Sequence, residues 1–208
     1  MTNDQLQTLP AEADIPTRYG DLRLQVFTDA DGKEHVAAIA GDVEGRSGVL
    51  CRMHSECLTS EIMGSLKCDC REQLETALRL IGAEGGVVIY LRQEGRGIGL
   101  ANKVRAYALQ SQGVDTVDAN RMLGLPDDLR SYELAGRILQ DLGVKSVRLL
   151  TNNPSKINGL SSAGVPIESH EPLICDVNGL AQGYLEVKRD RMGHLIPGAW
   201  QPERSDQT

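Results

Sequence analysis

Three cysteines in one short stretch constrain the fold of this chain more than any other feature of its sequence. Cys57, Cys68 and Cys70 lie within fourteen residues, in the segment RMHSECLTSEIMGSLKCDC that covers residues 52–70. Thiolates at such spacing are typical zinc ligands, and four protein ligands make a structural site whereas three ligands and a water make a catalytic one. The alternative is three reduced, partly buried thiols, which pack as small hydrophobic side chains. The close spacing favours the metal site.

The fourth ligand decides whether such a site would be structural or catalytic. His54 is close enough in sequence to complete a Cys₃His shell, whereas Cys175 is far away. If His54 is not a ligand, a water takes the open position and its pKa falls towards about 7. We favour the open site, because His54 stands beside other reactive residue types. His54-Ser55-Glu56 also matches half of the nucleobase-deaminase signature, but the later P-C-x-x-C is missing, which disfavours a deaminase proper.

Composition excludes several classes of protein. A net charge of −7 and only seven aromatic residues argue against a nucleic-acid partner. No apolar run approaches the roughly 18–20 residues needed to span a bilayer, and the polar, acidic start is neither a signal nor a transit peptide. An odd number of cysteines in a cluster fits a reducing compartment and metal binding better than disulfides. We therefore expect a cytoplasmic protein without a membrane partner.

Helical and strand patterns alternate along the chain and predict an α/β fold, a mixed β-sheet flanked by helices in a single compact domain. A hairpin is expected at residues 22–27 and 35–39, around the turn DADG. Strand 48–53 leads directly into the cysteine segment, and Cys51 should point into the core. The further expected elements are helix 73–83, strand 87–91, helix 101–112, an irregular segment 114–129, helix 131–142, strand 144–150, helix 155–163, strand 165–169 and helix 178–192.

The domain boundaries follow from composition. Residues 1–15 are polar and contain Pro10, which predicts a flexible N-terminus. Residues 16–196 form the expected domain, and residues 197–208 a polar C-terminal tail.

A charged, glycine-rich stretch, RQEGRGIG at residues 92–99, follows a predicted strand and opens a predicted helix. In that position backbone N–H groups can face an anion, and arginine binds phosphate bidentately. Glu94 could supply an oxygen ligand to Mg²⁺, and Lys103 and Arg105 follow on the helix. The alternative is a strand-to-helix turn with solvated charges, since the stretch is neither a Walker loop nor GxGxxG.

Three weaker signals lie further along the chain. Tyr107 is on the same predicted helix, where most tyrosines are simply half-buried. Asp128 and Arg130 lie before the next helix, in a segment that would otherwise serve as a cap or turn. Thr151-Asn152-Asn153-Pro154-Ser155-Lys156 follows a strand at the edge where α/β sheets bind ligands, although helix capping is the default explanation.

Taken together and in this order, these stretches resemble GTP cyclohydrolase II, the first committed enzyme of riboflavin synthesis. The resemblance runs from about Pro16 to Leu195, and its strongest parts are RMHSECLTSEIMGSLKCDC, RQEGRGIGLANKVRAYALQ and LLTNNPSK. It implies one Zn²⁺ per subunit on Cys57, Cys68 and Cys70, with water completing the shell. It implies GTP contacts by Arg52, Met53, His54, Ser55, Glu56, Gln73, Glu94, Gly95, Arg96, Thr116, Thr151 and Lys156. It also implies catalytic roles for Asp128 as proton acceptor, Arg130 as nucleophile and Tyr107 as an aid at the ring.

The implied reaction opens the imidazole ring of GTP at C8. Pyrophosphate and formate leave, and 2,5-diamino-6-ribosylamino-4(3H)-pyrimidinone 5′-phosphate remains. The resemblance further implies Mg²⁺ with the triphosphate and a homodimer. Because a guanidinium is protonated at neutral pH, charge stabilisation is the physical alternative to a nucleophilic Arg130.

Two other functions stay open: a variant that stops at the formylated pyrimidine, and a structural-zinc module that binds a nucleotide without turnover. Tyr107 favours the full reaction. The chain departs from the family pattern at Met53, where valine is expected, and at Arg71, which adds charge beside the metal. The 3,4-dihydroxybutanone phosphate synthase domain often fused upstream is missing, so one activity is expected.

Overall fold

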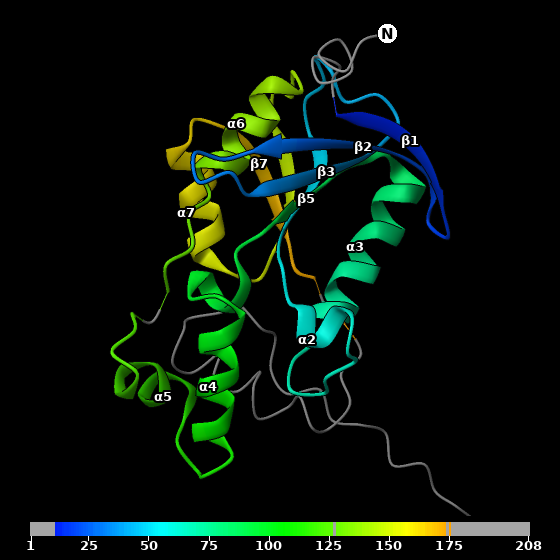
Figure 1. The fold of residues 1–208 in the computed structure, drawn as a ribbon. Coiled ribbons are helices and arrows are strands. Elements are labelled where there is room, and N and C mark those ends of the chain that lie inside the picture. Colours follow the sequence, from blue (N-terminus) through cyan, green and yellow to red (C-terminus); the bar gives the residue numbers. More distant parts are fainter. Residues whose placement is uncertain (1–10, 127, 174, 176–208) are drawn as a thin grey trace, which may run out of the picture.

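The computed structural model describes residues 11–126, 128–173 and 175, and its centre is a mixed seven-stranded sheet (Figure 1). The strand order is β1-β2-β3-β5-β4-β6-β7. The first three strands and β5 pair antiparallel, whereas β5, β4, β6 and β7 run parallel to one another. The strands are β1 (Glu12–Thr17), β2 (Gly20–Thr28), β3 (Glu34–Ala40), β4 (Val49–Ser55), β5 (Gly86–Leu91), β6 (Val147–Leu150) and β7 (Ile167–Glu171). The predicted α/β class with a mixed sheet is confirmed.

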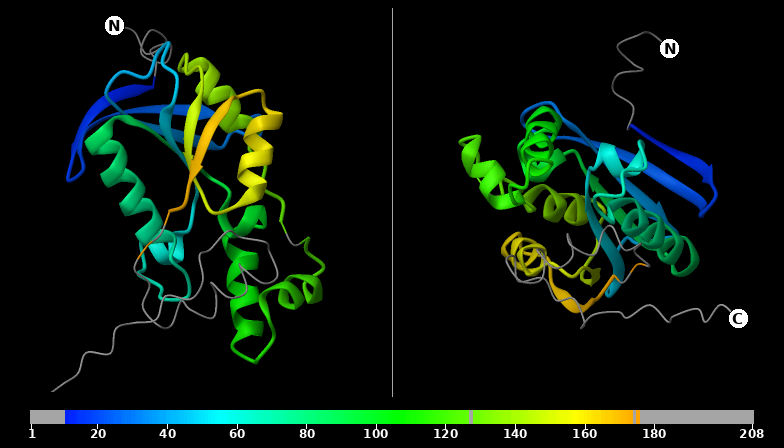
Figure 2. Two further views of the ribbon diagram at one scale, coloured as in Figure 1. Left: turned by 180° about the vertical axis from the view of Figure 1, so that it is seen from behind. Right: turned by 90° about the horizontal axis from the view of Figure 1, so that it is seen from below.

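Helices cover both faces of the sheet. α3 lies on one face, and α6 and α7 lie on the other (Figures 1 and 2). Two further helices, α4 and α5, lie together beyond one end of the sheet. The helical segments are α2 (Leu58–Glu61), α3 (Cys70–Glu84), the 3₁₀ turn η1 (Glu94–Gly97), α4 (Leu100–Gln110), α5 (Thr116–Met122), α6 (Glu133–Asp141) and α7 (Pro154–Ser162). No described helix is long and apolar enough to cross a bilayer.

Successive side chains of β4 alternate between the hydrophobic core and the face of the sheet that carries the site. Val49, Cys51 and Met53 are buried in the cluster shared with α6 and α7. The intervening Arg52 and His54 therefore lie on the α3 face, because successive side chains of a strand point to opposite faces. Cys51 is fully buried as expected, and burial raises the pKa of its thiol to about 12. It takes no part in the cysteine cluster.

The structure corrects the expected elements in two places. Strand β1 begins at Glu12, inside the segment expected to be flexible, and pairs in register with β2. Its residues are mostly exposed, so the sequence shows no alternating apolar face that would predict a strand. Helix α5 occupies part of the segment expected to be irregular, and Ala119 and Asn120 supply its buried side. The expected helix 178–192 and the tail 197–208 lie outside the described residues.

A glycine controls how closely the two central strands approach. Gly86 begins β5 with φ +142°, and a Cβ there would lie 2.2 Å from the carbonyl oxygen of Leu50 in β4. Gly32, in the hairpin turn, also has positive φ (+77°), but a Cβ there would meet nothing within 4 Å.

We expect Gly86→Ala to lower the free energy of unfolding by about 3 kcal/mol or more, because the strands must separate. Gly32→Ala, the matched control, should lose only about 1 kcal/mol, the cost of a left-handed backbone. Urea unfolding of both variants measures the difference. Equal losses would show that the contact between Gly86 and Leu50 does not limit the sheet.

Candidate active site

The carboxyl ends of the parallel strands β4, β5 and β6 meet at one edge of the sheet, and their loops form a pocket there. This is the edge at which α/β sheets bind ligands. His54 pairs with Tyr90 and Ser55 with Leu91, so β4 and β5 end side by side. The cysteine loop follows β4, the glycine-rich turn follows β5, and the Thr151–Asn153 segment follows β6.

The three clustered cysteines converge at this edge. Cys57 lies at the start of α2, and Cys68 and Cys70 lie at the start of α3. Their sulfur atoms all lie within 4.8 Å of one another, and Cys57 Sγ and Cys68 Sγ are 3.6 Å apart. Cys57 and Cys68 are buried and Cys70 is partly exposed. Three soft thiol ligands converging at a pocket wall suit Zn²⁺, with one side of the shell left to a non-protein ligand.

The thiols of the cluster do not ionise equally. Hydrogen bonds from Cys68 and Cys70, together with Lys103, hold the pKa of Cys57 far below its usual value. The hydrogen bond to Cys57 raises the pKa of Cys68 in turn. Metal binding requires the thiolate form of cysteine.

His54 is not part of the cysteine cluster, because another group holds its ring. Its Nε2 lies 2.8 Å from Glu61 Oε1, and the Tyr90 hydroxyl donates to Glu61 Oε2 at 2.6 Å. The His54 and Tyr90 rings also stack, with centroids 5.7 Å apart. Since Glu61 is the shared acceptor, the ring proton sits on Nε2 and leaves Nδ1 as an acceptor, which has no hydrogen-bond partner among the described residues. Burial lowers the His54 pKa to about 4.

The glycine-rich stretch forms the 3₁₀ turn η1 with an unusual backbone. Gly95 has φ 61° and Arg96 has φ 60°, and Arg96 is the one described non-glycine residue with a positive φ. Left-handed backbone at a non-glycine residue costs of order 1–3 kcal/mol and tends to occur at functional sites. The Arg96 carbonyl accepts a hydrogen bond from Leu129 N at 2.9 Å, which fixes the Asp128–Arg130 segment against the turn.

Asp128 and Arg130 form a close ion pair at the pocket. Arg130 Nη2 lies 2.5 Å from Asp128 Oδ2, and Arg130 Nε donates to the same carboxylate at 2.9 and 3.1 Å. Burial raises the pKa of Asp128, but the hydrogen bonds and charge of Arg130 lower it by more. The pKa of Asp128 therefore lies below its usual value. The carboxylate is thus a weak base that holds Arg130 in place. Arg130 lines the pocket.

Glu94 is occupied within the protein. Its Oε2 accepts from Leu58 N at 2.7 Å, and its Oε1 accepts from Gly95 N at 2.9 Å and Lys103 Nζ at 2.7 Å. The side chain is 8% exposed. Three donors therefore already use the Glu94 oxygens, and its interpretation as a Mg²⁺ ligand stays a prediction.

Buried hydrogen bonds position three further residues that the family resemblance assigns to GTP binding, namely Arg52, Gln73 and Lys156. Arg52 donates to Leu150 O at 2.8 Å and to Gln73 Oε1 at 2.6 Å, and Gln73 in turn donates to Asp69 Oδ2 at 2.6 Å. Lys156 donates to the Met53 carbonyl at 2.7 Å. The Arg52 and Gln73 bonds link β4 and β6 to the N-terminal end of α3, where two of the cysteines lie, and the Lys156 bond links α7 to β4.

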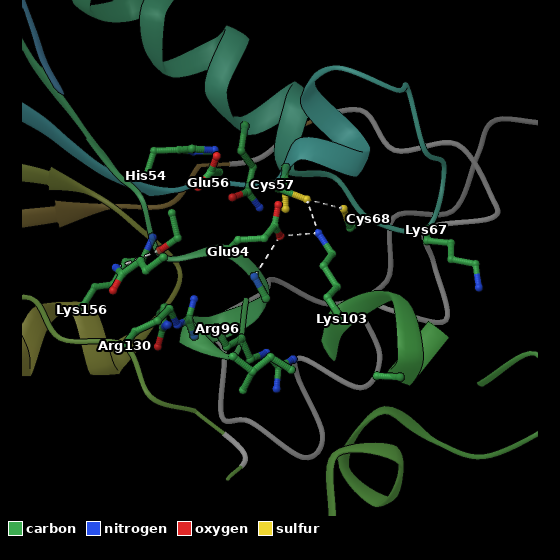
Figure 3. Close-up of a pocket in the computed structure, with 18 of the residues that line it drawn as sticks. His54, Glu56, Cys57, Lys67, Cys68, Glu94, Arg96, Lys103, Arg130 and Lys156 are labelled. Atoms are coloured by element: carbon green, nitrogen blue, oxygen red, sulfur yellow. Dashed lines mark hydrogen bonds and ion pairs between the residues drawn. The ribbon is translucent and has the colours of Figure 1, made fainter. Parts of the chain in front are cut away.

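Most of the predicted site residues face one pocket (Figure 3). Those that line it are Arg52, His54, Ser55, Glu56, Cys57, Cys68, Cys70, Gln73, Glu94, Gly95, Arg96, Tyr107, Arg130, Thr151 and Lys156. The Met53 side chain is instead buried in the core, and Asp128 contacts Arg130 without lining the pocket. Thr116 begins α5, and its side chain is outside the described part of the chain.

Sequence reasoning missed several residues at the pocket. Lys67 lies with Nζ 4.8 Å from the centroid of the Tyr107 ring, and both line the pocket. Glu61, the partner of His54, lies on a four-residue helix that no periodicity could reveal. In the sequence Lys103 is one of several charges on a predicted helix; its position four residues before Tyr107, on the same helix face, is the signal that could reveal it.

Comparison with known proteins identifies relatives along most of the chain. The profile of the family described as GTP cyclohydrolase II matches residues 8–172. A GTP cyclohydrolase-2 of Neisseria gonorrhoeae is 50% identical over 187 residues, which cover 89% of this chain and 95% of that protein. A riboflavin biosynthesis protein RibBA of Endomicrobium trichonymphae is 51% identical over 185 residues, covering 88% of this chain and 46% of that protein. The chain thus spans about half the length of the RibBA relatives.

The buried, neutral His54 should make stability depend on pH. In the unfolded chain its imidazole gains a proton below pH 6.5, whereas the folded protein takes it up only near pH 4. Acidification between these values therefore costs the folded state up to about 1.4 kcal/mol per pH unit. We expect His54→Gln to remove this slope from urea unfolding between pH 7 and 5.

His170→Gln, at an exposed histidine, is the matched control and should keep the slope of the parent protein. All three proteins are compared at one metal concentration. Parallel stability curves for the parent and His54→Gln would contradict the assignment of a neutral His54.

Proposed function

This chain belongs to the GTP cyclohydrolase II family, and from that premise we propose that it opens the imidazole ring of GTP in riboflavin biosynthesis. The proposed products are formate, pyrophosphate and 2,5-diamino-6-ribosylamino-4(3H)-pyrimidinone 5′-phosphate. The observation that carries the proposal is the meeting of the cysteine cluster, the arginines of the turn and loop, and Tyr107 in one pocket. A metal centre beside fixed cationic groups suits hydrolysis of an anionic substrate.

Zinc is the metal that fits the donor set. Cys57, Cys68 and Cys70 would hold it. His54 would not be a ligand, because its Nε2 is hydrogen-bonded to Glu61. When bound, Zn²⁺ would supply Lewis acidity and lower the pKa of water towards about 7. The three-ligand set favours a catalytic over a structural centre.

Cationic residues would bind the triphosphate. Arg96 and Arg130 lie close enough for the Arg96 charge to act on Asp128, the ion-pair partner of Arg130. Paired arginines can offset the charge that develops on leaving pyrophosphate. Mg²⁺ would bind with the triphosphate itself, since Glu94 is occupied. The homodimer remains a prediction from the family resemblance.

Arg130 would act as an electrostatic stabiliser rather than a nucleophile. Its guanidinium is held by three hydrogen bonds to Asp128. Removing a proton from this group requires a strong base, and the lowered pKa of Asp128 makes that carboxylate a weak one. The pair therefore orients a fixed positive charge towards the pocket.

Tyr107 and His54 would act at the purine. Tyr107 lines the pocket from α4, where its Oη can donate or accept a proton at a ring nitrogen. His54 lines the same pocket, and Glu61 fixes its ring in the Nε2–H form, so it would contact the base as a neutral imidazole. Arg52 and Gln73 reach the same pocket from β4 and α3.

The direct test is incubation of the zinc-loaded protein with GTP and Mg²⁺. We expect release of formate and pyrophosphate in equal amounts, with mass spectrometry giving the deformylated pyrimidine. Cys68→Ser should lose zinc and activity while remaining folded by circular dichroism.

Two other outcomes have separate meanings. A product that keeps the formyl group would identify the variant that stops after ring opening. Loss of fold in Cys68→Ser, with no turnover of GTP by the parent protein, would identify a structural-zinc module and contradict the proposal.

Removal of the Tyr107 hydroxyl should slow formate release. We expect Tyr107→Phe to lower kcat by about 10²-fold, the usual contribution of one acid–base group, without loss of zinc. Tyr19→Phe, in the turn between β1 and β2, is the control and should keep the parent kcat. Full formate release by Tyr107→Phe would exclude a proton-transfer role for this hydroxyl.

A further inference from the structure

A buried lysine points at the cysteine cluster from the helix across the pocket. Lys103 Nζ lies 3.0 Å from Cys57 Sγ and 2.7 Å from Glu94 Oε1 (Figure 3). Its side chain is 11% exposed. A buried ammonium is costly unless its charge is paired and its donors are used. Here the pairing involves one proposed metal ligand and one carboxylate.

Glu94 holds this lysine and the cysteine loop together. Its carboxylate accepts from Leu58 N, the backbone group directly after Cys57, as well as from Gly95 N and Lys103. One side chain therefore joins the start of α2, the turn η1 and helix α4. Displacement of Glu94 would free both Lys103 and the residue next to Cys57.

The charges of the centre explain why a cation is placed there. Three thiolates with one Zn²⁺ carry a single net negative charge, and the Glu94 carboxylate adds another. In a partly buried site such charges repel one another strongly unless a positive group lies between them. Lys103 lies between Glu94 and Cys57, in contact with both.

We propose that Lys103, held by Glu94, is a positioning residue that orients Cys57 and balances the charge of the metal centre. This inference rests on the zinc site of the proposed function. A hydrogen bond to a ligand atom fixes the direction of that ligand and tunes its donation to the metal. The Lys103 ammonium donates to the Cys57 sulfur, so Cys57 is the ligand whose direction it would fix. Glu94 then serves the metal centre through Lys103 rather than the nucleotide.

The competing role for Lys103 is direct contact with the substrate, because its side chain also lines the pocket. The two roles differ in what they affect. A positioning residue changes metal affinity and the metal's spectrum without any GTP present. A substrate contact changes KM and leaves the free metal site unaltered.

The test uses the full-length chain with Lys103→Met, Lys103→Arg, Glu94→Gln and the double variant Lys103→Met/Glu94→Gln. The double variant matters because Lys103→Met alone leaves the Glu94 charge buried and unpaired. Arg105→Met is the matched control, since Arg105 is an exposed cation on the same helix. Zinc affinity is measured by chelator competition, and Co²⁺-substituted protein reports the thiolate-to-metal charge-transfer band.

We expect Lys103→Met and the double variant to lose about 10- to 100-fold in zinc affinity, the usual effect of losing a group that supports a metal ligand. The Co²⁺ charge-transfer band should shift, while KM for GTP stays within about threefold. Lys103→Arg should recover most of the affinity, Glu94→Gln should lower it, and Arg105→Met should match the parent.

Unchanged zinc affinity and spectrum in the double variant and in Glu94→Gln would overturn the proposal, and a raised KM alone would assign Lys103 to the substrate. If both Lys103→Met forms fail to fold, Glu94→Gln and Lys103→Arg decide by the same readouts. Failure of the proposed function is seen separately: a parent protein that binds zinc but releases no formate leaves the metal readouts valid. A parent protein that binds no zinc contradicts both.

Discussion

The parallel pairing of β4 with β5 places the cysteine loop beside the glycine-rich turn, and the site depends on this neighbourhood. The pairing continues past the strands, since Glu56 N donates to Leu91 O at 2.9 Å. Leu58 N then reaches Glu94 at 2.7 Å. Two segments that are about 35 residues apart in sequence thus share one hydrogen-bond network. On the other side of β4, Thr151 follows strand β6, and Lys156 of α7 donates to the Met53 carbonyl.

The site concentrates charge and strain, and the surrounding bonds offset both. Arg52, Glu94 and Lys103 are buried, which is unfavourable for isolated charges. Each has partners from a different element, so the polar network also fixes the relative positions of those elements. The left-handed backbone of Arg96 is held by its carbonyl bond to Leu129. The residues that line the pocket are thereby preorganised, at a cost that the two hydrophobic clusters of the sheet offset.

Residues that carry local patterns could be predicted from the sequence, and residues defined by tertiary contacts could not. Spacing alone predicted a metal site at the cysteines, and the apolar run at 87–91 predicted the strand that leads to the turn. Strand β1 escaped because its residues are exposed on both sides, and α5 because its apolar stripe is short. The roles of Glu61 and Lys103 depend on groups 7 and 46 residues away in sequence. No periodicity encodes such contacts.

We expect the cysteine cluster to form an open zinc centre whose remaining position faces the pocket. X-ray absorption at the zinc edge of the zinc-loaded protein measures this coordination shell. We expect three sulfur scatterers at about 2.3 Å and one oxygen at about 2.0–2.2 Å. A shell of four sulfurs, or outer-shell scattering from an imidazole such as that of His54, would contradict it.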